Sequence, residues 1–447
     1  MSKVEPLTPR RQGVKLWKNN HEAIMTLVII LLTAGLFNVF SSTFVMAERD
    51  YGSPYAFLLR HAVSMILGLI LCYVGARVDY HKWRSLIMPV TVVLMACLLV
   101  VLLFTDPVNG ARRWIPLPGF SFQPAEFAKL VSIMLAGYYI SFRNGQGKEV
   151  NLFNRQLGVV GAMALLVYVE PDMGTACIVM GIPILMLVVG GLHFSKLKWL
   201  LLGGLILVGF MIYMQPYRLE RLMVTYDPWP YAQDQGYQTV RSLMSIGSGG
   251  LFGMGIGQGL SKYDYLPEAH TDFAFAVFSQ EMGFFVVLAI LIVYMLFCRY
   301  TAAIAMQAQD MYGQMLAVGV LLLIGGQAVA NLIMVSGMIP VVGVPLPFIS
   351  YGGTSLVMSL FAIGILVNIS RQTTMIKEKE LLPLTGYVHG GCSPVGMKKP
   401  FPTFIDSSAE SGAPICFSAG RVGRQVKTTL EGLRRVVNVT AADLAVE

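Results

Sequence analysis

The sequence predicts an all-α polytopic integral membrane protein with about ten transmembrane helices and one large extracytoplasmic loop between the seventh and the eighth. Three observations predict this class. Of the 447 residues, 55% are apolar and 13% are charged, whereas charged residues make up about a quarter of a soluble domain. The mean hydropathy is +0.63. Apolar runs recur along most of the chain, and their lengths are close to the ~20 residues that one membrane-spanning helix needs.

The individual spans follow from these apolar runs. They cover residues 23–45, 55–77, 85–104, 125–142, 156–170, 173–192, 197–214, 273–299, 314–336 and 349–370. Only Glu170-Pro171-Asp172 separates the fifth run from the sixth. Pro171 makes a break there credible, and one long kinked helix is the alternative. Ten spans place both termini on the same side of the membrane.

Basic residues predict the orientation. Residues 1–22 carry five Lys and Arg residues, and the apolar run that follows is longer than the 7–15 residues typical of a signal peptide. We therefore predict a cytoplasmic N-terminal segment and a retained first span. The net charge of +8 arises largely from short segments beside apolar runs, as the positive-inside rule predicts, so nucleic-acid binding is not expected. Arg112 and Arg113 are exceptions on the outer side, where an anionic ligand or lipid headgroups would explain them.

Several kinds of site are not indicated. The six cysteines form no CxxC pair, so neither a disulfide framework nor a zinc site is predicted. Ser350 lacks the Gly-x-Ser-x-Gly context of a hydrolase nucleophile. There is no Walker loop in the sequence.

The large extracytoplasmic loop covers residues 215–272. Its segment 245–259 contains seven glycines, so the backbone there can bend sharply and approach a ligand closely. No strand precedes the segment, which excludes a dinucleotide fingerprint. Gln238, Arg241 and several aromatic residues favour a structured re-entrant segment over a flexible loop.

Ionisable residues concentrate where this loop meets the eighth span. Glu268, His270 and Asp272 lie at the predicted membrane boundary. Asp272 also precedes the apolar run at a position suited to a helix N-cap, so capping is the alternative to a functional role. Glu281 lies inside the run. An uncompensated carboxylate in hydrocarbon costs at least ~2.5 kcal/mol, so we expect Glu281 to face a partner or a wet cavity.

Two further stretches carry unusual residues for a membrane span. Glu126 and Lys129 lie three positions apart at the start of the fourth span and can neutralise each other, as a structural salt bridge or as a functional pair. Residues 339–355 contain three prolines together with glycines. Irregular backbone at membrane depth is tolerated only where protein or water covers it, so we expect this segment to line a cavity.

The end of the chain has a different character. After about residue 380, Gly, Ser and Pro become frequent and the apolar runs stop. We predict that residues 376–447 form a cytoplasmic tail that is largely disordered. The interval 428–438 could form one short basic amphipathic helix.

Six motifs, in order along residues 20–375, resemble those of the SEDS family (shape, elongation, division and sporulation proteins), the peptidoglycan glycosyltransferases typified by FtsW and RodA. The motifs are Arg113–Ile115, Gln123–Lys129, Glu170–Thr175, Gly247–Gly253, Leu266–Phe273 and Pro345–Ser355. The tail resembles nothing in that family. The resemblance implies a ten-span SEDS domain over residues 23–375.

The resemblance also implies a reaction. The expected enzyme polymerises lipid II, an undecaprenyl-pyrophosphate-linked disaccharide pentapeptide, at the outer face of the bacterial cytoplasmic membrane, with inversion and loss of undecaprenyl pyrophosphate. Asp272 matches the family's essential aspartate. Its carboxylate could act as a general base or hold a divalent cation, Mg²⁺ or Mn²⁺, that acidifies the attacking hydroxyl. A lipid II flippase is the alternative function, and a non-catalytic scaffold is a third.

Candidate substrate-binding residues complete the expected site. The pyrophosphate requires cations, and the candidate clamps are Arg112, Arg113, Arg218 and Arg241. Arg113 is favoured because it lies in a matched motif. The other candidates for substrate binding are Trp114, Glu126, Lys129, His270 and Glu281.

One departure from the family bears on regulation. Many relatives have Gly-Glu-Glu where this chain has Ser279-Gln280-Glu281. Gln280 keeps the size and hydrogen bonding of glutamate and loses its charge. If that carboxylate takes part in activation, this protein is regulated differently.

The resemblance implies partners as well. The expected partner is a single-pass class B penicillin-binding protein, whose transpeptidase domain cross-links the new glycan, together with other divisome or elongasome membrane proteins. The segment 259–270 is more similar to FtsW, and 341–348 is also common in RodA-like chains. The sequence favours FtsW slightly and leaves division or elongation open.

Overall fold

The computed structural model describes residues 17, 19–107, 112–117, 120–193, 196, 198, 202–203, 223–263 and 265–372, and residues 382–442 with gaps. The chain divides into two compact units, Met1–Thr373 and Thr374–Glu447. The first unit contains the predicted spans, and the second contains the predicted tail.

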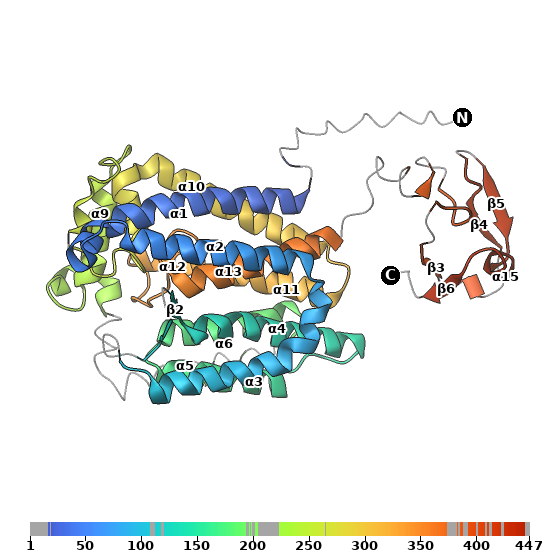
Figure 1. Cartoon of the computed structure of the whole chain (residues 1–447). Helices are drawn as coiled ribbons and strands as arrows, with labels where there is room; N and C mark the ends of the chain where they lie inside the picture. The colour runs from blue at the N-terminus through green and yellow to red at the C-terminus, as the bar shows by residue number, and fades with distance from the viewer. Residues whose placement is uncertain are drawn as a thin grey trace, which may run out of the picture. The chain divides into compact units, whose positions relative to one another are not determined.

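Long apolar helices lie side by side in the first unit (Figure 1). Seven described segments are long and apolar enough to cross a membrane: α1 (Asn20–Tyr51), α2 (Ala56–Arg77), α3 (Tyr80–Phe104), α4 (Pro124–Gly145), α10 (Ala274–Met306), Met311–Val335 and α13 (Gly353–Gln372). The segment Met311–Val335 consists of α11 (Met311–Leu321), the π-helical η3 (Leu322–Gly326) and α12 (Gln327–Val335). Two shorter apolar helices are α5 (Arg155–Val169) and α6 (Met173–Val189).

These helices correspond to nine of the ten predicted spans, with ends that differ by a few residues. The remaining span, residues 197–214, lies almost wholly outside the described residues, so the count of ten stays a prediction. The break at Glu170-Pro171-Asp172 is real. Asp172 precedes α6, and its Oδ1 accepts a hydrogen bond of 3.1 Å from the Thr175 N–H. The alternative of one long kinked helix is therefore wrong.

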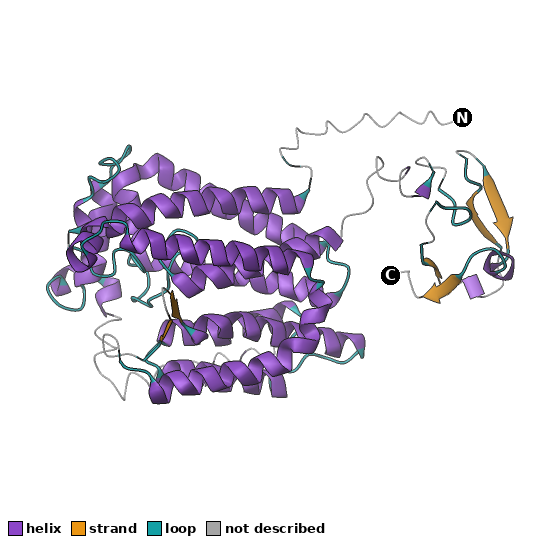
Figure 2. Cartoon of the chain, viewed as in Figure 1, coloured by secondary structure: helices purple, strands orange, loops and turns teal. Residues whose placement is uncertain are grey.

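Short elements gather at one end of the helix bundle, where Figure 1 shows β2 and α9. β1 (Ile115–Leu117) pairs antiparallel with β2 (Phe120–Phe122), and this hairpin is drawn in orange among the purple helices of Figure 2. The predicted large loop includes η1 (Trp229–Tyr231), α9 (Tyr237–Ser248) and η2 (Leu260–Lys262). The all-α prediction thus holds for the described spans and fails for this hairpin.

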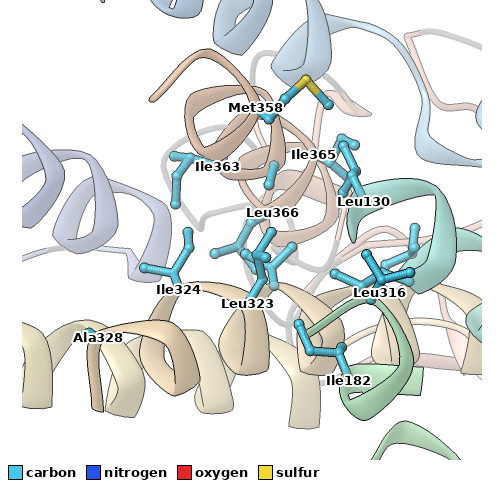
Figure 3. Packing of buried hydrophobic residues seen from close by; sticks show 14 of the residues in the cluster. Leu130, Ile182, Leu316, Leu323, Ile324, Ala328, Met358, Ile363, Ile365 and Leu366 are labelled. Atoms are coloured by element: carbon cyan, nitrogen blue, oxygen red, sulfur yellow. The ribbon is translucent and has the colours of Figure 1, made fainter. Parts of the chain in front are cut away.

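A continuous apolar core holds the helices together. Figure 3 shows Leu130 of α4, Leu323 and Ile324 of η3 and Leu366 of α13 gathered in one cluster. All four side chains are at most 5% exposed. The centre of the bundle is therefore closely packed, so a polar group in these helices must find its partners within the protein.

The second unit contradicts the prediction of a largely disordered tail. β3 (Thr403–Asp406) pairs parallel with β6 (Val439–Ala442), and β4 (Ile415–Ser418) pairs antiparallel with β5 (Gln425–Thr428). The helix α15 (Leu430–Arg434) falls within the predicted interval 428–438. Leu430, Leu433 and Val439 form a small buried cluster. The prediction was wrong because these strands have four residues each and create no long apolar run.

Close contact between α2 and α13 gives a test of the fold. A Cβ added at Gly364 would lie 2.3 Å from the carbonyl oxygen of Cys72, and neither backbone can yield without moving a helix. Gly364→Ala should therefore lower the thermal unfolding midpoint of the purified protein, by overpacking that costs about 1–3 kcal/mol. Gly158→Ala in α5 is the matched control, because a Cβ there meets nothing within 4 Å. It should leave the midpoint unchanged or raise it slightly. Equal midpoints for the two variants would contradict the packing.

Candidate active site

Asp272 lies in the turn directly before α10. The N-cap of α10 is Phe273, and no side chain caps the helix. The alternative reading of Asp272 as a helix cap is therefore wrong, and its carboxylate is not committed to the α10 backbone.

The backbone around Asp272 is held by two neighbouring segments. Asn331 of α12 donates from Nδ2 to the carbonyl oxygens of Asp272 and Val344, at 2.7 Å in both cases. The Tyr351 N–H donates to the carbonyl oxygen of His270 at 2.9 Å. The irregular segment 340–352 and α12 together fix the turn that carries the carboxylate.

The surroundings of Asp272 favour its protonated form more than water does. The pKa of Asp272 is raised to about 7, chiefly by burial and also by the charges of Glu268 and Asp172, while the charge of Arg113 opposes the rise. A Cβ added at Gly343, where φ is +73°, would lie 3.4 Å from Asp272 Oδ2, so the carboxyl packs beside the irregular segment. A carboxyl with a pKa near neutrality can accept and release a proton at working pH.

Arg113 and the α5–α6 turn lie near this carboxyl. The Arg113 guanidinium donates to the carbonyl oxygen of Glu170 at 3.3 Å and to that of Pro171. Asp172 Oδ2 accepts a hydrogen bond of 3.1 Å from Gln123 Nε2. Motifs that are far apart in the sequence therefore meet here, as the resemblance requires. Trp114 is partly exposed beside Arg113.

Glu170 is a site residue that the sequence did not single out, because the only signal at Glu170 was its membership of a matched motif. Its side chain is fully buried, and neither carboxyl oxygen has a hydrogen-bond partner among the described residues. The pKa of Glu170 is raised to about 8, chiefly by burial and also by the charge of Asp172, while the charge of Arg113 opposes the rise. The turn thus brings a second carboxyl with a raised pKa close to Arg113.

The predicted pair in α4 is part of a longer polar chain. Lys129 Nζ lies 2.7 Å from Glu126 Oε2, and both side chains are buried. Lys129 Nζ also donates to Gln327 Oε1 at 3.4 Å, and Gln327 Nε2 donates to the Pro345 carbonyl oxygen at 3.0 Å. The pair is thereby connected to the irregular segment beside Asp272.

Gln327 and Asn331 are the other residues that the sequence analysis missed. They lie four positions apart on α12 and so share one face. Both amides donate to carbonyl oxygens of the irregular segment. Two amides at this spacing in an apolar span were the available signal. Protein covers part of the irregular segment, because Val344, Leu346 and Ile349 are buried. The expectation that the segment lines a cavity stays a prediction.

The other outer cations are placed differently. Arg241 lies over the ring of Tyr265, 3.9 Å from its centroid, and also faces Tyr237 of α9. Arg112 is exposed and donates to the Leu102 carbonyl oxygen at 3.1 Å. Arg218 lies outside the described residues. Of the predicted clamps, Arg113 is the one whose charge acts on Asp272 in the described structure.

His270 and Glu281 have protein neighbours. The His270 ring packs near Phe57 and Tyr351, with centroids 5.7 and 5.9 Å away. Burial lowers the pKa of His270, and Glu268 opposes that shift. Glu281 forms a buried ion pair of 2.9 Å with Lys262. The expectation that Glu281 faces a partner is therefore confirmed.

A divalent cation finds no preformed centre here. Within the described parts of the chain, no group of three or more His, Cys, Asp or Glu residues is placed to hold a metal ion. Divalent cations usually need several oxygen ligands. The carboxyls around Asp272 therefore do not fit a resident metal, and we derive no step through one.

Comparisons with known proteins agree with the motifs. The family model described as "Cell cycle protein" for FtsW, RodA and SpoVE matches residues 22–375. A probable peptidoglycan glycosyltransferase FtsW of Geobacter sp. (strain M18) is 35% identical over 78% of this chain and 95% of its own length. Stage V sporulation protein E of Bacillus subtilis (strain 168) is 36% identical over 78% of this chain and 96% of its own length.

Solved structures share the fold. A structure of a peptidoglycan synthase complex that coordinates polymerization and crosslinking has a chain with a TM-score of 0.66 and 26% identity, covering 80% of this chain and all of its own. Rod shape determining protein RodA of Thermus thermophilus has a TM-score of 0.56 and 25% identity, covering 79% of this chain and 97% of its own. A second family model, "Aminoacyl-tRNA editing domain", matches residues 360–436, a range that begins inside α13.

The electrostatics of Asp272 make stability depend on pH. Because folding raises the pKa of Asp272 from 3.8 to about 7, its native state loses stability as the pH rises between those values, at about 1.4 kcal/mol for each pH unit. Asp272→Asn removes the buried charge. The variant should unfold at a higher temperature than the wild type at about pH 8, and the difference should shrink at about pH 5. A difference that does not change with pH would show that Asp272 is not desolvated.

Proposed function

Because the chain belongs to the cell cycle protein family of FtsW, RodA and SpoVE, we propose that Asp272 is the general base of its glycosyl transfer. The protein is a multi-pass membrane enzyme, a peptidoglycan glycosyltransferase. The observation that carries the proposal is the placement of the Asp272 carboxyl. It is desolvated, has a pKa raised to about 7, and lies near Arg113 and Asp172, which belong to two other motifs of the chain.

The substrate in this proposal is lipid II, in an acceptor and a donor molecule. Asp272 takes the proton from the acceptor's GlcNAc 4-hydroxyl as the oxygen attacks the donor's anomeric carbon. The new glycosidic bond forms while the bond from that carbon to the pyrophosphate oxygen breaks. The pyrophosphate leaves with the electron pair, and attack from the opposite face inverts the anomeric centre. Asp272 then releases its proton to water.

Arg113 is the residue that suits the leaving group. Its guanidinium is oriented by the carbonyl oxygens of Glu170 and Pro171, so its charge needs little rearrangement to meet a developing pyrophosphate. Its charge also opposes the rise in the pKa of Asp272 and helps to keep part of that base ionised. Trp114, which follows it, is partly exposed and could contact the same substrate.

The Glu126–Lys129 pair serves the site indirectly in this proposal. Lys129 is matched by Glu126, which lies 2.7 Å away, so the buried pair carries no net charge. Through Gln327 it connects to the Pro345 carbonyl oxygen. We assign the pair to holding the irregular segment in the shape that packs against Asp272.

The partner and the location are also proposed. The related synthase complex joins polymerization to crosslinking, which supports a class B penicillin-binding protein as the partner here. One of the two curated relatives compared above is a probable FtsW protein, which supports a role in division within a complex of other divisome membrane proteins. The bacterial cytoplasmic membrane, with both termini inside, fits this reaction.

Glycan synthesis from purified lipid II, with the class B partner present, tests the proposed base. The wild type should form long glycan, and Asp272→Asn should lower the rate at least about 100-fold, because a positioned base contributes 10²–10⁴. Asp234→Asn is the matched control, since Asp234 is exposed on the same large loop. The control should keep the wild-type rate. Equal rates for Asp272→Asn and the wild type would rule Asp272 out as the base.

A further inference from the structure

The helix α10 is interrupted at Gly283, where φ is 75° and ψ is 179°. Backbone groups beside the break bond to the glycine-rich segment instead of to their own helix. Four hydrogen bonds join the two segments: Met254 N–H to Gln280 O (3.0 Å), Gly255 N–H to Glu281 O (3.1 Å), Phe284 N–H to Gly250 O (3.0 Å) and Phe285 N–H to Leu251 O (3.3 Å). Residues 249–255, here called the glycine clip, thus fill the gap in α10.

Gly253 of the clip and Gly283 of α10 are required by this contact. A Cβ added at Gly253 would lie 2.1 Å from the Glu281 carbonyl oxygen, and one added at Gly283 would lie 2.1 Å from the Gly253 nitrogen. Both glycines also have positive φ. The close backbone approach expected of this segment is therefore an approach to α10.

Side chains just before the break hold the next part of the loop. Glu281 Oε1 accepts hydrogen bonds from Lys262 Nζ at 2.9 Å and from the Gly259 N–H at 3.3 Å. Glu281 Oε2 accepts a hydrogen bond of 2.6 Å from Ser41 of α1. The Lys262 side chain is fully buried, and its Nζ lies 4.8 Å from the centre of the Phe44 ring. Both oxygens of Glu281 are thus taken by protein groups.

Gln280 adds a second attachment. Its Oε1 accepts a hydrogen bond of 3.1 Å from the Ser261 N–H, and its Nε2 donates to Ser248 Oγ at 2.8 Å. Among the described residues of this contact, the neutral amide leaves one carboxylate, Glu281, to match one cation, Lys262. The charge lost at position 280 is therefore compatible with a balanced contact.

The contacts of Gln280 and Glu281 with residues 259–262, here called the junction, join the two ends of the stretch of chain that contains Asp272. The loop runs from Lys262 to Asp272, where the Leu266 N–H donates to the Ser261 carbonyl oxygen at 3.1 Å. From Ala274 the chain returns to Glu281 as helix. The ion pair thus joins both ends of a twenty-residue stretch, residues 262–281, with Asp272 near its middle.

We propose that Lys262 and Glu281 are positioning residues for glycosyl transfer, because their buried ion pair and the glycine clip hold the loop that presents Asp272. The proposal rests on the assignment of Asp272 as the base. The sequence made Glu281 a candidate for substrate binding. In this account its carboxylate holds the loop instead. Ser41 of α1 donates a hydrogen bond to Glu281. A movement of α1 would therefore displace the loop that carries Asp272 through this ion pair.

The test is a double variant, Lys262→Met together with Glu281→Met. Replacing a buried ion pair by apolar residues of similar volume is often neutral for stability, whereas removing one partner is strongly destabilising. Lys262→Met alone should lower the thermal midpoint, and the double variant should restore it. The double variant should keep kcat for lipid II polymerisation at least about tenfold low, since small misplacements of a reacting group cost up to about 100-fold. The KM should stay within about twofold of the wild type.

The pH profile separates positioning from structural support. A loosened loop exposes Asp272 to water, so the rising limb of kcat/KM should move to lower pH in the double variant. A loss of folded enzyme would leave that limb in place. A double variant with wild-type midpoint, kcat and pH limb would overturn the proposal, as would a tenfold rise in KM at unchanged kcat. Glu149→Gln is the matched control, because Glu149 pairs with Lys196 at 3.5 Å on the surface, and it should change none of these values.

Hydrogen exchange of residues 259–273 separates this proposal from the base assignment. Exchange should be faster in the double variant than in the wild type, whatever group acts as the base. An exchange rate in the double variant equal to that of the wild type would overturn the role of the ion pair in holding the loop. An active Asp272→Asn enzyme would overturn the base assignment alone. If the double variant does not fold, Lys262→Gln together with Glu281→Gln replaces it, because two amides keep hydrogen-bonding groups at the contact and leave no unpaired buried charge. A wild-type kcat and pH limb in that variant would also overturn the proposal.

Discussion

The structure depends on one constraint, that backbone left unpaired by an interrupted helix in a membrane must be paired by other protein groups. Irregular backbone occurs at three places that bear on Asp272: the break at Gly283 in α10, the irregular segment 340–352, and the α5–α6 turn. The glycine clip forms hydrogen bonds with the backbone at the α10 break. Gln327 and Asn331 donate to carbonyl oxygens of the irregular segment, and Arg113 donates to a carbonyl oxygen of the α5–α6 turn. Asp272 lies beside the second and the third of these places, and the first turns of α10 connect it to the first.

The same packing gives Asp272 its chemistry. Protein that covers the irregular backbone also removes water from the carboxyl, and this desolvation is the largest cause of its raised pKa. The carboxyl groups of Glu268 and Asp172 add repulsion, and Arg113 keeps the shift from becoming larger. A base suited to neutral pH therefore needs no special local sequence in this account. It arises from segments that are distant in the chain and close in space.

The sequence predicted features that depend on local pattern. Hydropathy located the described spans, and the three-residue spacing of Glu126 and Lys129 identified their contact. The sequence did not predict that Lys262 is the partner of Glu281. The two residues are nineteen positions apart, across a loop and a helix, and no local pattern relates them. Asp272 was placed correctly before the eighth predicted span, but its apparent N-cap position was misleading because α10 begins two residues later. The folded second unit escaped notice because its small core comes from short strands with no apolar run.

The central claim is that a desolvated Asp272 is the base, and the pH dependence of kcat/KM for lipid II polymerisation tests it most directly. Measured with the class B partner from about pH 5 to about pH 9, the wild type should show a rising limb with an apparent pKa close to 7, as one ionising carboxyl requires. An activity that stays constant down to about pH 5 would mean that the essential base titrates like an ordinary exposed aspartate. That result would contradict the account.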